Sequence, residues 1–178
     1  MSIYMKHIKI RKETWETNSS STHALVIRTE KPILPSEVYF DVGEFGWEKE
    51  KYNDIDTKCR YLHTAIYQRF YDYYMDVSKY YEYKDKITEI LESYGVKANW
   101  RDVKNIKEEY EWCYIDHCDE LEDFIEMLIS VPELLIDWLF NSESLLVTDN
   151  DNSEMEYYLD AEEKYDNKEG YLFYGKGN

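Results

Sequence analysis

The chain begins with two short stretches whose hydrophobic residues follow the pattern of β-strands. In residues 3–12 isoleucines alternate with basic residues, and residues 23–29 (HALVIRT) are rich in β-branched and other apolar side chains. The stretch between them, KETWETNSSST, is too long for a tight turn and is dense in hydroxyl groups. The pattern therefore predicts an N-terminal β-hairpin with a long polar loop.

Hydrophobic residues in the middle of the chain recur at spacings of three and four, which is typical of amphipathic helices. The first such helix is predicted over residues 54–75, on the positions Ile55, Cys59, Leu62, Ile66, Phe70 and Tyr73. A second helix is predicted over 78–94, ending at Gly95, which is a suitable C-cap residue. A third is predicted over 118–129, with acidic residues in the first turn, and residues 131–140 continue helically.

The remaining segments predict further strands. Residues 36–50 look extended, 144–149 and 171–177 have strand composition, and 96–115 stays ambiguous because VKANW and YEWCYI could each form a strand. The order of elements is not the regular alternation of a parallel α/β fold. We expect a single α+β domain over residues 1–178, in which an N-terminal β-hairpin and a short mixed or antiparallel sheet pack against three to four helices.

The composition indicates in which cellular compartment the protein is expected. A chain of 178 residues with 43% hydrophobic residues can bury a core without disulfide bonds. Its three cysteines are an odd number, and charged residues interrupt the N-terminal stretch where a signal peptide needs an apolar run. No stretch has the length of apolar residues that a membrane helix requires. These features predict a soluble cytoplasmic protein with reduced thiols.

The net charge of −17 is concentrated in one part of the chain. Residues 108–169 hold 21 Asp or Glu and two Lys, a net charge of −19, so the rest of the chain carries +2. Within that rest, residues 1–31 carry six basic and three acidic residues, a net charge of +3. A phosphate backbone is repelled by the acidic part, so direct binding of duplex DNA there is not expected.

The acidic part has three interpretations. Its carboxylates could contact a basic protein surface, could coordinate a metal through oxygen, or could be a solvated face that favours solubility. The density of carboxylates, with so few local basic partners, favours the first interpretation. The residues predicted to bind a partner are Asp116, Asp119, Glu120, Glu154, Glu156, Glu162 and Glu163.

The polar loop before residue 24 contains groups that could act on RNA. A histidine can serve as general base, hydroxyls and amides can position an anion, and basic residues can neutralise a phosphate. The predicted catalytic residues are Asn18, Ser19, Ser20, Ser21, Thr22 and His23, and the predicted phosphate-binding residues are Arg11, Lys12 and Arg28. The alternative is a structural loop held by Asx and Ser/Thr turns, with His23 on the same strand face as Leu25 and Ile27.

A second group of residues has spacings that metal ligands use. Cys59 and His63 are four residues apart, as are Cys113 and His117, so each pair could share one helix face and together form a Cys2His2 zinc site. The alternative is ordinary packing of small thiols on helix faces. Apart from this candidate zinc site we expect no metal and no cofactor.

Two stretches resemble small proteins that recur in bacteriophages and other mobile elements. The first is WETNSSSTHALVI at 15–27, and the second is GEFGWE at 43–48, followed by KYND at 51–54 and YLHTAI at 61–66. In its length, acidity and content of 19 tyrosines, the chain is also similar to anti-CRISPR proteins directed at type II-A systems.

These resemblances imply a phage-encoded anti-defence protein that works in the host cell cytoplasm. Its partner would be a basic protein surface on a CRISPR effector nuclease with its guide RNA. The resemblance implies either a metal-independent RNase acting on the guide RNA or a non-catalytic acidic mimic of nucleic acid that occupies a basic groove of the effector. A structural or regulatory phage protein is the remaining alternative.

Overall fold

The structure is a computed structural model that describes residues 21–27, 32–47, 50–73, 75–109, 113–116, 121–149 and 171–176. It combines helices with two separate sheets, which confirms the predicted α+β class. The helices are α1 (Ile55–Ile66), the π-helix η1 (Tyr67–Tyr73), α2 (Val77–Ser93), α3 (Val103–Glu109), α4 (Leu121–Ser130) and α5 (Pro132–Phe140). No helix in this described part combines the length and apolar character needed to cross a membrane.

Capping residues explain where the two central helices begin. The Asp54 carboxylate accepts a hydrogen bond from the Thr57 N–H at 2.7 Å, and Asp76 does the same for Lys79 at 3.1 Å. Helix α2 ends before Gly95, which has a positive φ of 79°. The predicted boundaries are confirmed, although the predicted helix over 54–75 changes from α to π geometry after Ile66.

The smaller sheet pairs β2 (Glu37–Phe40) with β4 (Lys97–Trp100) in parallel. Parallel neighbours need a crossover connection, which here contains α1 and α2. Val38 and Phe40 are buried and alternate with exposed residues along β2. The prediction of a strand at VKANW is confirmed, whereas the rest of the ambiguous segment contains α3 and then an isolated bridge.

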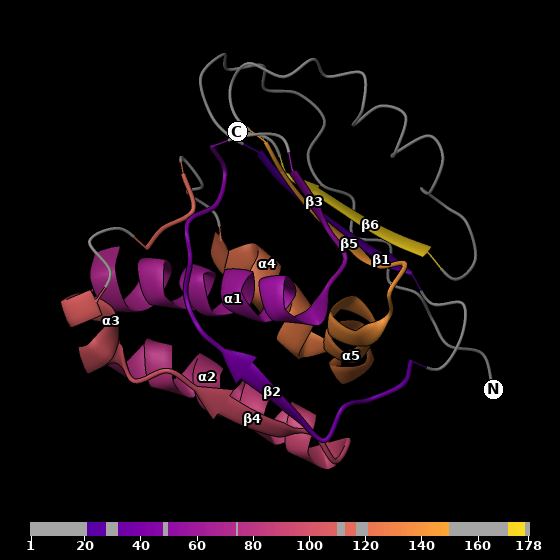
Figure 1. Ribbon diagram of the computed structural model, residues 1–178, viewed down its shortest axis with the longest axis horizontal. Coiled ribbons are helices and arrows are strands. Elements are labelled where there is room, and N and C mark those ends of the chain that lie inside the picture. Colours follow the sequence, from indigo (N-terminus) through magenta and orange to yellow (C-terminus); the bar gives the residue numbers. More distant parts are fainter. Residues whose placement is uncertain are drawn as a thin grey trace.

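The larger sheet is antiparallel, with β1 (Ser21–Ile27), β3 (Glu50–Tyr52), β5 (Leu145–Asp149) and β6 (Tyr171–Lys176) in the order β3-β5-β1-β6. It lies apart from the smaller sheet, with α1 and α5 between them (Figure 1). Strand β1 pairs with β5 on one side and β6 on the other. A strand has only two edges, so the predicted hairpin of residues 3–12 with 23–29 is not formed along residues 22–25. Residues 3–12 themselves lie outside the described part.

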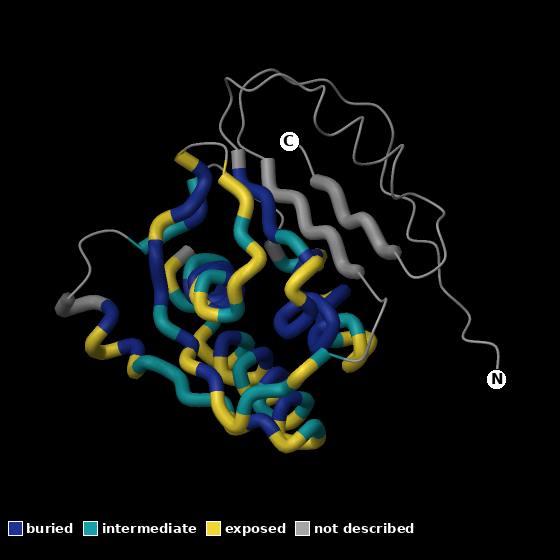
Figure 2. Tube along the Cα trace, turned by 45° about the vertical axis from the view of Figure 1, so that its right-hand side comes forward, coloured by how far each residue is buried: buried dark blue, intermediate teal, exposed yellow. Residues whose placement is uncertain are grey.

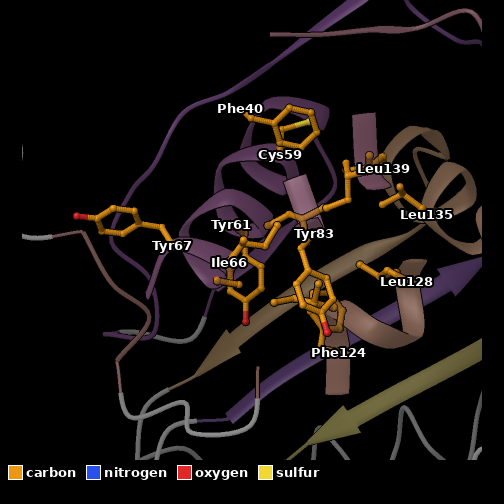
Figure 3. Packing of buried hydrophobic residues seen from close by; sticks show 14 of the residues in the cluster. Phe40, Cys59, Tyr61, Ile66, Tyr67, Tyr83, Phe124, Leu128, Leu135 and Leu139 are labelled. Carbon is orange, nitrogen blue, oxygen red and sulfur yellow. The ribbon is translucent and has the colours of Figure 1, made fainter. Parts of the chain in front are cut away.

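Helix α1 is the centre of the core. It contacts β2, α2, α4 and α5, and most of its residues from Lys58 onward are buried. Figure 2 shows the buried residues gathered in the interior where α1 and α5 meet. The core side chains around Tyr61, Phe124 and Leu139 come from several helices, as Figure 3 shows. The helix is buried because neighbours cover it on nearly all sides, so its packing largely determines the fold.

A buried lysine joins α1 to the end of α5. The Lys58 ammonium donates hydrogen bonds to the carbonyl oxygens of Trp138 at 2.8 Å and Asn141 at 3.3 Å. These carbonyls belong to the last turn and C-cap of α5, where the helix dipole favours a cation. Burial lowers the pKa of Lys58 to about 8, with Asp54 acting in the opposite direction. The lysine therefore stabilises a helix end at the expense of desolvation.

Candidate protein-docking surface

Two segments far apart in the sequence meet at an isolated parallel bridge between Phe45 and Ile115. The Phe45 N–H donates to the Tyr114 carbonyl at 3.0 Å, and the Asp116 N–H donates to the Phe45 carbonyl at 2.8 Å. The buried Phe45 ring packs edge-on against Tyr61 of α1. The core thus anchors residues 43–47 and, through them, residues 113–116.

The side chain of Gln68 completes the pairing of Ile115. Its Oε1 accepts from the Ile115 N–H at 2.6 Å, and its Nε2 donates to the Ile115 carbonyl at 3.0 Å. A primary amide can make both bonds at once, so it acts here as a neighbouring strand would. Gln68 lies in the π-helix η1, which places it opposite this segment. The bonds fix the backbone that carries Tyr114 and Asp116.

We expect Gln68→Ala to lower the free energy of unfolding by about 2 kcal/mol, because it removes two hydrogen bonds and leaves the backbone groups of a buried residue unpaired. Gln68→Glu is the comparison of equal length: its carboxylate can still accept from the Ile115 N–H but turns a second acceptor toward the Ile115 carbonyl, so it should also be less stable than wild type. Urea denaturation measures all three. Equal stability of Gln68→Ala and wild type would show that this amide does not hold the segment.

Two aromatic rings and three carboxylates lie around this bridge. The Trp47 and Tyr114 rings meet edge to face, with centroids 5.7 Å apart and an interplanar angle of 71°. Trp47 is 53% exposed and Tyr114 is half-buried. We call the group of Glu44, Trp47, Asp72, Tyr114 and Asp116 the Trp47 surface.

The charges of these carboxylates act on Tyr114 and on the neighbouring Cys113. Burial first, and then the charges of Asp116 and Glu44, raise the pKa of Tyr114. Burial, followed by the charges of Asp72 and Glu44, raises the pKa of Cys113 to about 11. Arg60 lies beside Gly43, and its guanidinium donates to the Val42 carbonyl at 3.1 and 3.2 Å. The Trp47 surface is therefore aromatic and predominantly acidic.

The predicted partner-binding residues are only partly described. Asp116 lies on the Trp47 surface, next to Gly46. Asp119, Glu120, Glu154, Glu156, Glu162 and Glu163 lie outside the described residues. Glu44, Trp47 and Asp72 were missed because they precede the acidic segment 108–169. The GEFGWE motif was a usable signal, since its two glycines flank aromatic residues.

The predicted catalytic loop is only partly a loop. Ser21, Thr22 and His23 form the start of strand β1, where His23 stands opposite Val147 of β5 and Gly175 of β6. The other predicted catalytic residues, Asn18, Ser19 and Ser20, and the predicted phosphate-binding residues, Arg11, Lys12 and Arg28, lie outside the described part. The structure thus places half of the group in an inner strand, and the catalytic role stays a prediction.

The predicted zinc ligand His63 has other partners. Its Nδ1 lies 2.9 Å from the Phe40 carbonyl and its Nε2 lies 2.8 Å from the Tyr80 hydroxyl. Nδ1 therefore carries the proton and Nε2 accepts from Tyr80. Burial lowers the pKa of His63 to about 4, so the ring is neutral at pH 7. Both nitrogens are engaged, which leaves no position for a metal.

Of the other members of the predicted zinc site, Cys59 and Cys113 are described and His117 is not. Cys59 is buried in the core, and burial raises the pKa of its thiol. Cys113 instead has Asp72 and Glu44 as its charged neighbours, and His117 lies outside the described residues. Within the described ranges, no group of three or more His, Cys, Asp or Glu residues could hold a metal ion. The packing alternative fits Cys59 and His63 better than zinc binding does.

Comparison of the chain with protein-family models, with curated proteins and with solved structures finds no match. The function is therefore inferred from the chemistry of the protein's own residues.

Proposed function

We propose that this chain is a binding protein that docks the Trp47 surface, together with the acidic residues of 108–169, onto a basic protein surface that otherwise holds nucleic acid. The observation that carries the proposal is the edge-to-face pair of Trp47 and Tyr114, with Asp116 next to Gly46 and with the charge of Glu44 acting on Tyr114. Aromatic residues bordered by carboxylates suit a protein interface with a basic partner, because the rings supply contact area and the charges supply complementarity.

The proposed partner is the effector ribonucleoprotein of a type II CRISPR system, in the cytoplasm of a phage-infected host. The resemblance of residues 15–27 and 43–48 to phage proteins supports a phage origin. The acidic, tyrosine-rich composition supports mimicry of nucleic acid in the basic channel of the effector. On this proposal the acidic portion binds no duplex DNA itself, and the protein acts without a membrane or a cofactor.

A second candidate function is cleavage of the guide RNA by residues 18–23. One register position favours it, since Lys176 of β6 stands directly opposite Thr22 of β1. The pairing supports this candidate because it adds a basic residue to the same part of the sequence pattern as the predicted phosphate-binding residues Arg11, Lys12 and Arg28. A cation near a histidine and several hydroxyls is a suitable arrangement for phosphate chemistry.

The docking proposal predicts a local and salt-dependent loss of binding. The triple variant Glu44→Gln, Asp72→Asn, Asp116→Asn should bind the effector ribonucleoprotein about tenfold more weakly, because each neutralised charge at an interface contributes roughly 0.5 kcal/mol. The matched control is Asp85→Asn, Glu89→Gln, Glu92→Gln, which removes the same charge from exposed positions of α2. Affinity is measured by interferometry at several salt concentrations. Equal losses in the two triple variants would reject the Trp47 surface as the docking site.

The two candidate functions are separated by the state of the guide RNA. The effector is incubated with wild-type protein or with His23→Ala, and the RNA is examined on a denaturing gel. Inhibition with intact RNA in both samples supports docking and rejects the nuclease. Shortened RNA with wild type and intact RNA with His23→Ala supports the nuclease.

A further inference from the structure

Strand β2 lies at an edge of the smaller sheet. Among the described elements it pairs with β4 alone, and Figure 1 shows the two strands side by side. Glu37 and Tyr39 are exposed, Tyr39 to 60%. Edge strands are commonly protected against further pairing by lysine, proline or a bulge. Pro35 precedes β2, but the strand itself, Glu-Val-Tyr-Phe, has none of these and is rich in residues that favour β-structure.

The hydrogen bonds of the ladder determine which backbone groups of β2 remain available. The Lys97 N–H donates to the Ser36 carbonyl at 3.0 Å, and the parallel register continues from there without interruption. Because every second residue of a strand points its backbone groups to the same side, Ser36 and the other even-numbered residues of β2 face β4. Glu37 and Tyr39 therefore point their N–H and carbonyl groups outward. Within the described ranges no hydrogen bond reaches these four groups.

These outward groups form a pattern that is complementary to itself. If two copies of β2 lie antiparallel about a two-fold axis at Val38, Glu37 of each copy stands opposite Tyr39 of the other. Each such pair exchanges two hydrogen bonds, so the two pairs use all the outward groups and give four hydrogen bonds in total. The same edge serves on both copies, as a two-fold interface requires. Each Glu37 stands opposite a tyrosine, so no like charges are directly opposed.

The charges along β2 are compensated within the sheet, although the whole chain carries −17. A Glu37 carboxylate oxygen lies 4.0 Å from the Lys97 ammonium, and an Asp41 carboxylate oxygen lies 3.0 Å from the Arg101 guanidinium. A strongly basic or acidic segment therefore finds no excess of opposite charge at this edge, whereas a second copy needs none. Two copies also repel each other less here than at an acidic surface, which favours a second copy as the occupant.

We propose that two copies of this chain pair along β2 and join their smaller sheets into one four-stranded sheet, in the order β4-β2-β2-β4, around a two-fold axis at Val38. The interface consists of the four main-chain hydrogen bonds and the exposed Tyr39 side chains. Such an interface is small, so the dimer is weak and forms at high protein concentration. The inference is independent of the docking function, because neither Glu37 nor Tyr39 belongs to the Trp47 surface.

Analytical ultracentrifugation tests the proposal at protein concentrations up to about 1 mM, where even a weak dimer is populated. High salt is used because it screens the repulsion between two chains of net charge −17. Wild type should show a reversible monomer–dimer equilibrium. Tyr39→Pro removes a donor that points away from β4, so it should fold but dimerise about thirtyfold more weakly, since two of the four bonds are lost. Tyr39→Thr is the matched control, because it keeps the donor and a strand-forming side chain, and it should stay within about fivefold of wild type.

Cysteine cross-linking tests the register and decides the question if Tyr39→Pro fails to fold. Glu37→Cys and Tyr39→Cys are prepared separately, each with Cys113→Ser and Cys118→Ser. Residues of a hydrogen-bonded antiparallel pair have Cα atoms about 5.5 Å apart, which suits a disulfide bond. An equal mixture of the two variants should therefore form disulfide-linked dimers several-fold faster than either variant alone. The proposal is overturned if wild type stays monomeric, if a folded Tyr39→Pro dimerises like wild type, or if the mixture cross-links no faster than the separate variants.

Discussion

Replacing His63 with alanine is expected to lower the free energy of unfolding at pH 7 by about 3 kcal/mol or more. The change leaves a cavity in the core and removes the bond that satisfies the buried Tyr80 hydroxyl. The Phe40 carbonyl keeps one donor, since it also accepts from the Arg101 N–H at 3.0 Å. Chemical denaturation at pH 7 measures the loss.

The same histidine should make the stability of the wild type depend on pH. Its pKa in the folded state is about 4, compared with an ordinary value of 6.5, because burial disfavours the charged ring. Between these values the unfolded chain binds a proton that the folded chain does not. Stability is therefore full above pH 6.5 and falls by about 3 kcal/mol as the pH decreases toward 4.

His63→Gln is the matched control for both effects. Its amide can donate to the Phe40 carbonyl and accept from Tyr80, yet it does not titrate. We expect near wild-type stability at pH 7 and a flat profile between pH 6.5 and 4. Carboxylates with lowered pKa values, such as Asp54, Asp76 and Glu122, lose their contributions as the pH falls below their usual range. If the stability of His63→Gln still falls between pH 6.5 and 4, a group other than His63 causes this pH dependence.

Gly46→Ala is expected to destabilise the protein by about 2 kcal/mol and to weaken docking. Gly46 has a φ of +95°, a conformation that side chains rarely adopt. An added Cβ would also lie 3.2 Å from both the Cβ and the backbone nitrogen of Asp116. Relief of that contact requires the Asp116 backbone to shift by a few tenths of an ångström, which disturbs its position on the Trp47 surface.

Gly95→Ala separates the two causes. Gly95 also has a positive φ, of +79°, but an added Cβ there meets no atom within 4 Å. It should cost only the backbone term, about 1 kcal/mol, and leave docking unchanged. Thermal or urea unfolding of the two variants gives the comparison. If both variants lose the same amount of stability and keep docking, the close approach of Gly46 to Asp116 is not important.

The helices were largely predictable because their signals are local. The spacing of Ile55, Cys59, Leu62 and Ile66, with Asp54 before them, is sufficient for α1. The partners of β1 were not predictable in the same way. Strand pairing depends on residues far away in the chain, and the apolar run of 23–29 carries no information about whether its neighbour is 3–12, 145–149 or 171–176.

The candidate sites, too, depend on contacts between residues that are far apart in the chain. The four-residue spacing of Cys59 and His63 is compatible with a metal site and with a packed helix face, and only the positions of Phe40 and Tyr80 distinguish them. The motif around Trp47 was visible in the sequence, but its approach to Asp116 was not. Charge could be assigned to a segment from composition alone, whereas a surface needs the tertiary contacts.

The central position of β1 has a consequence for biosynthesis. This strand precedes every other described element, whereas its neighbour β6 is translated after all of them. Until then one edge of β1 has unpaired backbone groups, which is a hazard for association with other nascent chains. The larger sheet can be completed only after β6 has been translated, and such long-range strand pairing predicts slow folding. A prematurely terminated product would lack the strand that closes this edge.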